Sequence, residues 1–301
     1  MALPKIEVPT YELTLPSRDE KIGYRPFTVK EEKILMIASE SENQNEIYNA
    51  ITKMINACTF DKLDSAKLPL FDIEYIFLQI RSKSVGEIAK FRVVCPDDLE
   101  TYADVEVDIS KVDVHVDDDH TNKIMLDESR NLGVVFGYPT LGVTRVAKNI
   151  TDAKTEDIFD IIYSCVDHIF EGEKIYPAKD TSKKEMIEFF DSISQENLVD
   201  IKKFFDTMPQ LKYTLEVENP KTKVKSEVTF RGLSDFFSIC LSHSNLEAYF
   251  ETNFALMQHH KYSITEIENM LPWERDIYVD MLINYIKEEN EKRKREQEKM
   301  K

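Results

Sequence analysis

The sequence predicts an α+β protein in which helical blocks carry two inserted antiparallel β elements and the C-terminus is helical. Three patterns indicate this class. Apolar residues recur at three- and four-residue spacings behind helix-capping signatures, in two separate blocks. Between about residues 87 and 137 the apolar spacing changes to two, as in strands with one buried face. A later alternating stretch, at about residues 211–230, is interrupted by Asn219-Pro220, which is typical of a hairpin turn.

The start of the chain is expected to form a β-hairpin. Polar residues 17–20 separate two extended stretches, one with Ile6, Val8, Tyr11, Leu13 and Leu15 and the other running from Ile22 to Phe27.

Three amphipathic helices are expected next. The first begins at a capping box, Thr28-x-x-Glu31, in which each side chain satisfies a free amide of the first turn. The second has apolar residues at helical spacing from Ile47 to Ile55, and the third opens at Pro69 and runs to Ser84.

The region at about residues 87–137 is expected to form an acidic, β-rich subdomain. Residues 97–128 hold twelve Asp or Glu against two Lys. Alternation predicts five short strands, at residues 91–95, 105–109, 112–116, 124–126 and 134–136.

Beyond Pro139 the pattern is mainly helical. An apolar stripe from Ile158 to Ile169 predicts one helix, and capping signatures at Ser182, Ser194 and Ser263 open others. Helices are also expected at residues 233–240, 246–259 and 273–289, the last of them starting at Pro272.

These elements suggest a mixed α+β domain at residues 1–150 and a mainly helical domain at residues 151–290. A charged tail, residues 291–301, is expected as solvated helix or as disorder.

Composition excludes several functional classes. The net charge of −17, from 56 acidic and 39 basic residues, argues against a nucleic-acid partner. No apolar run reaches the length of a membrane span, and residues 1–5 do not begin a signal peptide, so we expect a cytosolic protein with no membrane partner. The four cysteines lack CxxC spacing and are expected to be buried free thiols.

The sequence predicts no catalytic, cofactor-binding or metal-ligating residue. It contains no glycine-rich phosphate loop and no nucleophile or zinc signature, and its six histidines are scattered and expected on the surface. The run Asp117-Asp118-Asp119-His120 resembles a ligand cluster but lacks the central Gly and late Glu of a calcium loop, so we expect a solvated loop.

The candidate functional site lies near the C-terminus and is a partner-binding one. The only tryptophan, Trp273, is close to Arg275 and Tyr278, residue types that are enriched in binding hot spots. An apolar helical stripe follows, and the candidate set is Trp273, Arg275, Tyr278, Met281, Leu282 and Tyr285. The alternative is that this stripe packs on the preceding helices.

Five blocks carry a family resemblance: Lys5-Ile-Glu-Val-Pro-Thr-Tyr-Glu-Leu-Thr-Leu-Pro, Tyr24-Arg-Pro-Phe-Thr-Val-Lys-Glu-Glu, Phe71-Asp-Ile-Glu-Tyr-Ile-Phe-Leu-Gln, Phe230-Arg-Gly-Leu-Ser-Asp-Phe-Phe and Met270-Leu-Pro-Trp-Glu-Arg-Asp-Ile-Tyr. The first four resemble the baseplate hub assembly proteins of T-even-like phages. The last is similar to the end of the companion hub assembly factor in such phages.

The resemblance implies a chaperone-like assembly factor that binds baseplate hub or tape-measure proteins in the host cytoplasm during infection. Two alternatives remain, a permanent hub subunit in the virion tail and a tail enzyme. Some relatives carry paired cysteines at their hairpin tips, in a zinc-ribbon manner. Here the tips are Cys95-Pro-Asp-Asp and Asn219-Pro-Lys-Thr, so metal binding is not carried over.

Overall fold

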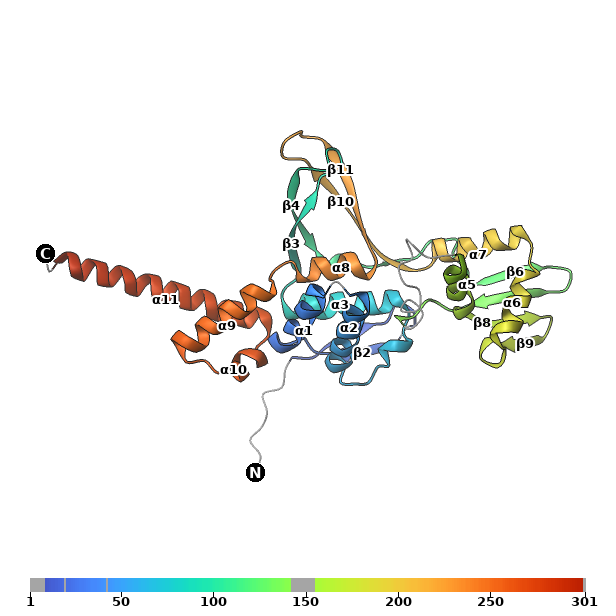
Figure 1. Cartoon of the computed structure of the whole chain (residues 1–301), viewed down its shortest axis with the longest axis horizontal. Helices are drawn as coiled ribbons and strands as arrows, with labels where there is room; N and C mark the ends of the chain where they lie inside the picture. Colours follow the sequence, from blue (N-terminus) through green and yellow to red (C-terminus); the bar gives the residue numbers. More distant parts are fainter. Residues whose placement is uncertain (1–8, 19, 42, 142–154, 300–301) are drawn as a thin grey trace, which may run out of the picture.

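The computed structural model describes residues 9–18, 20–41, 43–141 and 155–299, and its fold is α+β as predicted. Four parts are visible in Figure 1: a central body, a β tower that rises from it, a side lobe, and a C-terminal arm on the opposite side. Their residues are 11–84 with 232–241 for the central body, 88–108 with 210–231 for the β tower, 123–136 with 155–207 for the side lobe, and 246–299 for the arm.

The central body contains the predicted hairpin and the three predicted helices. β1 (Tyr11–Thr14) pairs antiparallel with β2 (Lys21–Tyr24), and α1 (Val29–Glu40), α2 (Gln44–Cys58), a short 3-10 turn (Ser65–Lys67) and α3 (Leu70–Ser84) follow. The capping box at Thr28 and Glu31 is present. Ile6 and Val8, predicted in the same hairpin, lie outside the described residues.

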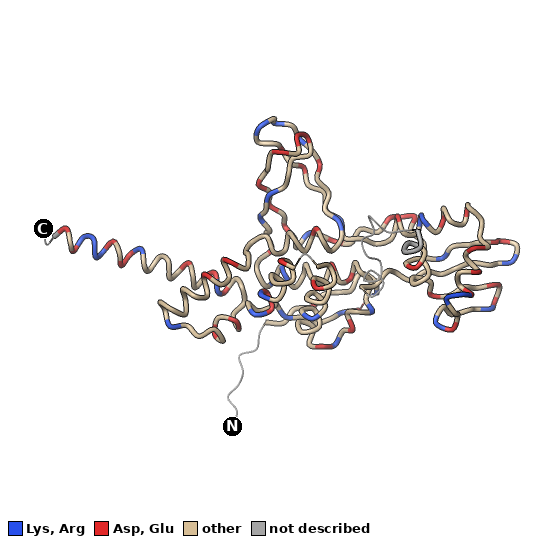
Figure 2. Tube along the Cα trace, in the orientation of Figure 1, with Lys and Arg blue, Asp and Glu red and all other residues tan. Residues whose placement is uncertain are grey.

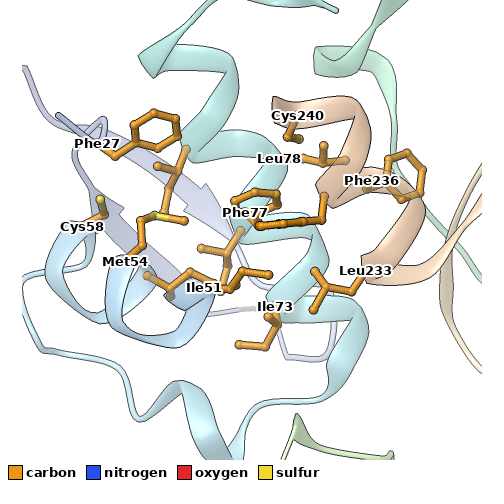
Figure 3. Packing of buried hydrophobic residues seen from close by; sticks show 14 of the residues in the cluster. Phe27, Ile51, Met54, Cys58, Ile73, Phe77, Leu78, Leu233, Phe236 and Cys240 are labelled. Carbon is orange, nitrogen blue, oxygen red and sulfur yellow. The ribbon is translucent and has the colours of Figure 1, made fainter. Parts of the chain in front are cut away.

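The main core forms where α8 (Gly232–Leu241) returns from the far part of the sequence and packs on α3 (Figure 3). Phe77 and Phe237 stack there with ring centroids 5.8 Å apart. The four cysteines are free and buried, as predicted, and burial raises the pKa of the Cys165 thiol to about 12.

A buried carboxyl joins α3 to two later elements. Glu74 accepts backbone hydrogen bonds from Leu211 and Leu233, but desolvation dominates and raises its pKa to about 8. Glu74 is therefore largely protonated in the folded protein at neutral pH.

The β tower consists of two hairpins packed face to face. β3 (Ile88–Val94) pairs with β4 (Tyr102–Asp108), and β10 (Gln210–Glu218) pairs with β11 (Lys225–Arg231). Alternate side chains of both hairpins meet in a small core of Val93, Cys95, Ala103 and Val217. After a 3-10 turn (Ile109–Lys111), the short β5 (Val114–His115) pairs with the start of β10.

Hydrogen bonds join the two tips of the tower. Asn219 Nδ2 donates to Asp97 Oδ1 at 2.9 Å and to Asp98 Oδ2 at 3.1 Å, and Thr222 Oγ1 donates to Asp97 Oδ2 at 2.6 Å. The bonds from Thr222 and Asn219 lower the pKa of Asp97. Among the described residues, no group of three or more His, Cys, Asp or Glu could hold a metal ion.

The side lobe is a four-stranded antiparallel sheet covered by helices. The strand order is β6 (Lys123–Asp127), β7 (Leu132–Phe136), β8 (Val166–Glu171) and β9 (Lys174–Pro177). α5 (Thr155–Ser164) precedes β8, and a 3-10 turn (Ala178–Asp180), α6 (Lys183–Asp191) and α7 (Gln195–Thr207) follow β9. Met186, Phe190, Ile201 and Phe204 of these last two helices complete the core of the lobe.

The prediction of one helix across residues 158–169 is wrong. α5 ends at Ser164, and β8 begins two residues later. The segment is a strand and not a helix because a two-residue loop, Gly172 and Glu173, lets it pair with β9 in a hairpin. Gly172 has φ +61, which glycine adopts without strain. A short apolar run does not by itself distinguish a strand from a helix turn.

The five predicted strands at residues 91–136 exist, but they do not form one subdomain. β3 and β4 belong to the tower, β5 pairs with β10, and β6 and β7 belong to the side lobe. The predicted domain boundary at residue 150 lies outside the described residues, and β7 and β8 pair across it.

His120 and His243, which were expected on the surface, are partly buried. His120 packs against the rings of Tyr138 and Phe204, which also stack on each other. Its two ring nitrogens bond to Thr207 Oγ1 and the Tyr138 hydroxyl, at 3.0 and 3.1 Å. Burial lowers its pKa. His243 contacts a buried carboxylate at the base of the arm.

Candidate protein-binding surface

The predicted site residues lie in the C-terminal arm, which consists of α9 (Leu246–His260), α10 (Ile264–Asn269) and α11 (Pro272–Lys299). Local signals position these helices: Asn245 accepts a hydrogen bond from the Ala248 amide, and Ser263 with Glu266 forms the predicted capping box. α11 runs away from the body, and the C-terminus lies at the far end of the molecule (Figure 1). Of the two alternatives for the charged tail, residues 291–299 adopt the helical one.

One side of α11 attaches the helix to the arm's own core. Val279 and Leu282 pack against a cluster formed by Val29, Met36, Tyr249, Leu256 and Ile267, which come from α1, α9 and α10. Lys33 of α1 also pairs with Glu268 of α10, and this contact lowers the pKa of Glu268. The arm is therefore packed on α1.

Arg275 lies on this inner side and is buried. Its Nη2 lies 3.5 Å from Oε2 of the fully buried Glu32, and its guanidinium lies 5.9 Å from the Tyr249 ring centroid. His243 Nε2 lies 2.7 Å from Glu32 Oε1, and its Nδ1 lies 3.1 Å from the Cys240 carbonyl oxygen. Both ring nitrogens thus face acceptors. Arg275 and His243 together surround one buried carboxylate.

Another side of α11 is apolar and exposed. We call Trp273, Ile277, Tyr278, Met281 and Tyr285 the exposed ridge. Their exposed fractions are 39% for Trp273, 51% for Ile277, 49% for Tyr278, 62% for Met281 and 61% for Tyr285. Four of the five recur at every fourth residue, so they follow one row along the helix surface. Among the described residues, this row is not consumed by the protein's own core.

The structure therefore divides the six predicted site residues. Trp273, Tyr278, Met281 and Tyr285 come together on the exposed ridge, and Ile277 joins them although it was not in the predicted set. Leu282 packs inward and Arg275 is buried, so neither is placed to touch a partner in this conformation. Arg275, predicted as a partner-binding residue, is buried because it pairs with Glu32, which is remote in sequence, as well as with the adjacent Asp276. Partner binding by the ridge stays a prediction.

A second exposed apolar row lies on α9 and was missed from the sequence. Phe250, Phe254 and Met257 follow the spacing i, i+4, i+7 and remain exposed, whereas Tyr249, Asn253 and Leu256 are buried. The signal was present in the sequence, since both faces of this helix carry large apolar residues.

The charge around the ridge is one-sided. Residues 262–286 contain Glu266, Glu268, Glu274, Asp276 and Asp280, and their only basic residue is the buried Arg275. Glu268 is paired with Lys33, and Arg275 Nη2 lies 3.4 Å from Asp276 Oδ1. Beyond residue 286 the charges alternate in sign, as the mixed red and blue of the helix end shows (Figure 2). Trp273 and the rest of the ridge therefore lie in an acidic setting.

A groove of about 890 Å³ lies elsewhere and is lined by β3, β4, α8 and Phe230 of β11. Two of its carboxylates are held in surface ion pairs, Asp104 with Arg92 at 2.9 Å and Glu106 with Lys90 at 2.6 Å. These pairs satisfy the carboxylates locally and do not assemble a proton-transfer site.

Comparisons with known proteins give a consistent relationship. A family model described as "T4 bacteriophage base plate protein" matches residues 8–238. A protein named "Baseplate hub assembly protein gp26", from Enterobacteria phage T4, is 22% identical over 221 residues, which cover 72% of this chain and 93% of that protein. No solved structure matches the chain. In the described part of the chain, none of the helices has the length and apolar character needed to cross a membrane.

Proposed function

Because this chain belongs to the family of T4 bacteriophage base plate proteins, we propose that it assists assembly of the baseplate hub by holding another hub or tape-measure protein on the exposed ridge of α11. The observation that carries this proposal is the ridge itself. Large aromatic and aliphatic side chains are exposed in one row on a helix whose other side is already packed. Exposed apolar patches of this kind mark sites where another protein binds.

The division of the chain supports a separate role for the arm. The family match ends at residue 238, within α8, so it covers the central body, the β tower and the side lobe. The arm that carries the ridge follows the matched range. We assign baseplate membership to the matched part and the capture of a partner to the arm.

A role in assembly, and not in chemistry, is supported by the name of the similar protein, a hub assembly protein. The proposal assigns no catalytic residue, cofactor or metal to the chain. Nucleic acid is not among the proposed partners, since the net charge is −17.

Co-expression with individual hub and tape-measure proteins tests the ridge. We expect Trp273→Ala and Tyr278→Asp each to abolish co-purification of the partner while leaving the circular dichroism spectrum unchanged. Tyr102→Asp is the matched control, because Tyr102 is more exposed than Tyr278, at 61% against 49%, but lies on the β tower. Binding that survives both ridge variants would show that the ridge is not the docking site.

A second measurement separates an assembly factor from a permanent subunit. An assembly factor of the proposed kind leaves the finished particle, so mass spectrometry of purified virions should find the chain absent or far below stoichiometric amounts. Stoichiometric recovery would assign it to the hub as a structural subunit.

A further inference from the structure

We infer that the segment held by the exposed ridge is an amphipathic helix whose flanks carry lysine and arginine. This inference rests on the proposed function and specifies the chemistry of the partner. It follows from the shape of the ridge and from the charges beside it.

The shape of the ridge fits a helix. Trp273, Ile277, Met281 and Tyr285 form a row at four-residue spacing, the row that packs into the matching groove of another helix in the commonest class of helix crossing. From Trp273 to Tyr285 the row spans about 18 Å, or roughly three turns, at 1.5 Å per residue. A partner helix of similar length covers it. An extended strand is not favoured, because α11 satisfies its own backbone groups and offers none for pairing.

The charge beside the ridge selects the flanks of the partner. Asp276 and Asp280 lie along one side of it. Glu288 follows at its distal end, where Lys292 is close enough to interact with it. Arg275 Nη2 lies 3.4 Å from Asp276 Oδ1, so it offsets part of the charge of Asp276, whereas Asp280 forms no ion pair with the described residues. A partner with acidic flanks meets like charges here, whereas Lys and Arg flanks are attracted.

The same charges disfavour a second copy of this chain as the occupant. In an antiparallel pair centred on Met281, Ile277 of one copy faces Tyr285 of the other, so Glu274 faces Glu288. Like charges placed opposite each other on packed helices are destabilising. Self-pairing is therefore an outcome to be tested and not the one we expect.

The test uses the full chain and two synthetic helical peptides of roughly four turns. Both peptides have the same leucine face and contain no tryptophan, and their flanks are all lysine in one and all glutamate in the other. Trp273 is the only tryptophan and lies on the ridge, so its fluorescence reports whether the ridge is covered.

We expect the lysine peptide to bind at least about tenfold more tightly than the glutamate peptide, with affinity falling as salt is raised. Ile277→Asp should abolish binding. Ile283→Asp should leave it unchanged, since Ile283 is exposed on the same helix but lies off the ridge. The double variant Asp280→Lys with Glu288→Lys should reverse the preference between the two peptides.

Three results would overturn the inference: equal binding of both peptides, binding of neither, or self-association of the chain that Ile277→Asp abolishes. The outcome is separable from the proposed function. If the ridge variants abolish capture of a hub protein but the chain shows no preference for the lysine peptide, only the proposed charge of the partner is rejected. Capture that the ridge variants do not affect rejects the docking site itself.

Discussion

Replacing Arg275 with alanine is expected to release α11 from the body. The guanidinium is 4% exposed and faces Glu32, which is fully buried. Removing one partner of a buried ion pair costs roughly 3–5 kcal/mol, because the remaining charge stays buried without compensation. Glu32 keeps its contact with His243 at 2.7 Å, which favours the lower end of that range. Loss of the cation–π contact with Tyr249 adds about 1 kcal/mol, so we expect about 3–4 kcal/mol in total.

Hydrogen exchange of α9–α11 amides measures this effect locally, because exchange reports the free energy of opening each segment. In Arg275→Ala, the inner side of α11 should exchange much faster, while amides of α3 in the main core should keep their protection. The matched control is the double variant Glu32→Gln with Arg275→Met, which removes both charges and keeps similar volumes. It should recover stability to within about 1 kcal/mol of the natural protein.

Unchanged exchange of α11 in Arg275→Ala would contradict this expectation. A double variant as unstable as the two single changes added together would contradict it as well. In either case the contact with Glu32 does not hold the arm in place, and the packing of Val279 and Leu282 alone accounts for its position.

Three further variants test other parts of the fold. Glu74→Gln should gain roughly 4 kcal/mol at pH 8 in urea unfolding and at most a few tenths near pH 4.5, because the raised pKa of about 8 means that stability is lost as pH rises from 4.5 to 8. An equal gain at both pH values would contradict this. Asn219→Ala should speed amide exchange several-fold at both tower tips, and Thr222→Val should give a smaller change. Unchanged exchange would show that these hydrogen bonds do not hold the tips together. Gly133→Ala places a methyl group 2.4 Å from the Phe170 ring and 2.6 Å from the Ile124 carbonyl oxygen, and it should cost roughly 1–3 kcal/mol in thermal unfolding. A smaller side chain at 170 should relieve only part of this cost, because the backbone contact remains.

The capping boxes were predictable because their geometry is local. Thr28 with Glu31, Ser182 with Glu185, and Ser263 with Glu266 each satisfy amides within one helical turn, and all three form as expected. The hairpins at the N-terminus and in the β tower follow in the same way from alternation and turn residues close in sequence.

The assembly of the strands was not predictable, since it depends on contacts between distant segments. Alternation located β3 to β7, but only the folded chain pairs β7 with β8 and places the β3–β4 hairpin against the β10–β11 hairpin. Pairing between segments so far apart requires the closure of long loops, and no local sequence pattern indicates which segments pair.

The candidate site shows the same division. The sequence by itself determined that α11 carries large apolar and aromatic residues around much of its circumference, starting at Pro272 and Trp273. It did not determine which of them would remain exposed, because helical periodicity describes the faces of a helix and not their neighbours. Only the tertiary structure decided that α1 and α9 cover Val279 and Leu282, that Glu32 neutralises Arg275, and that the ridge is left uncovered. The physical reason is that burial is a property of packed pairs of surfaces, and the second surface comes from distant parts of the chain.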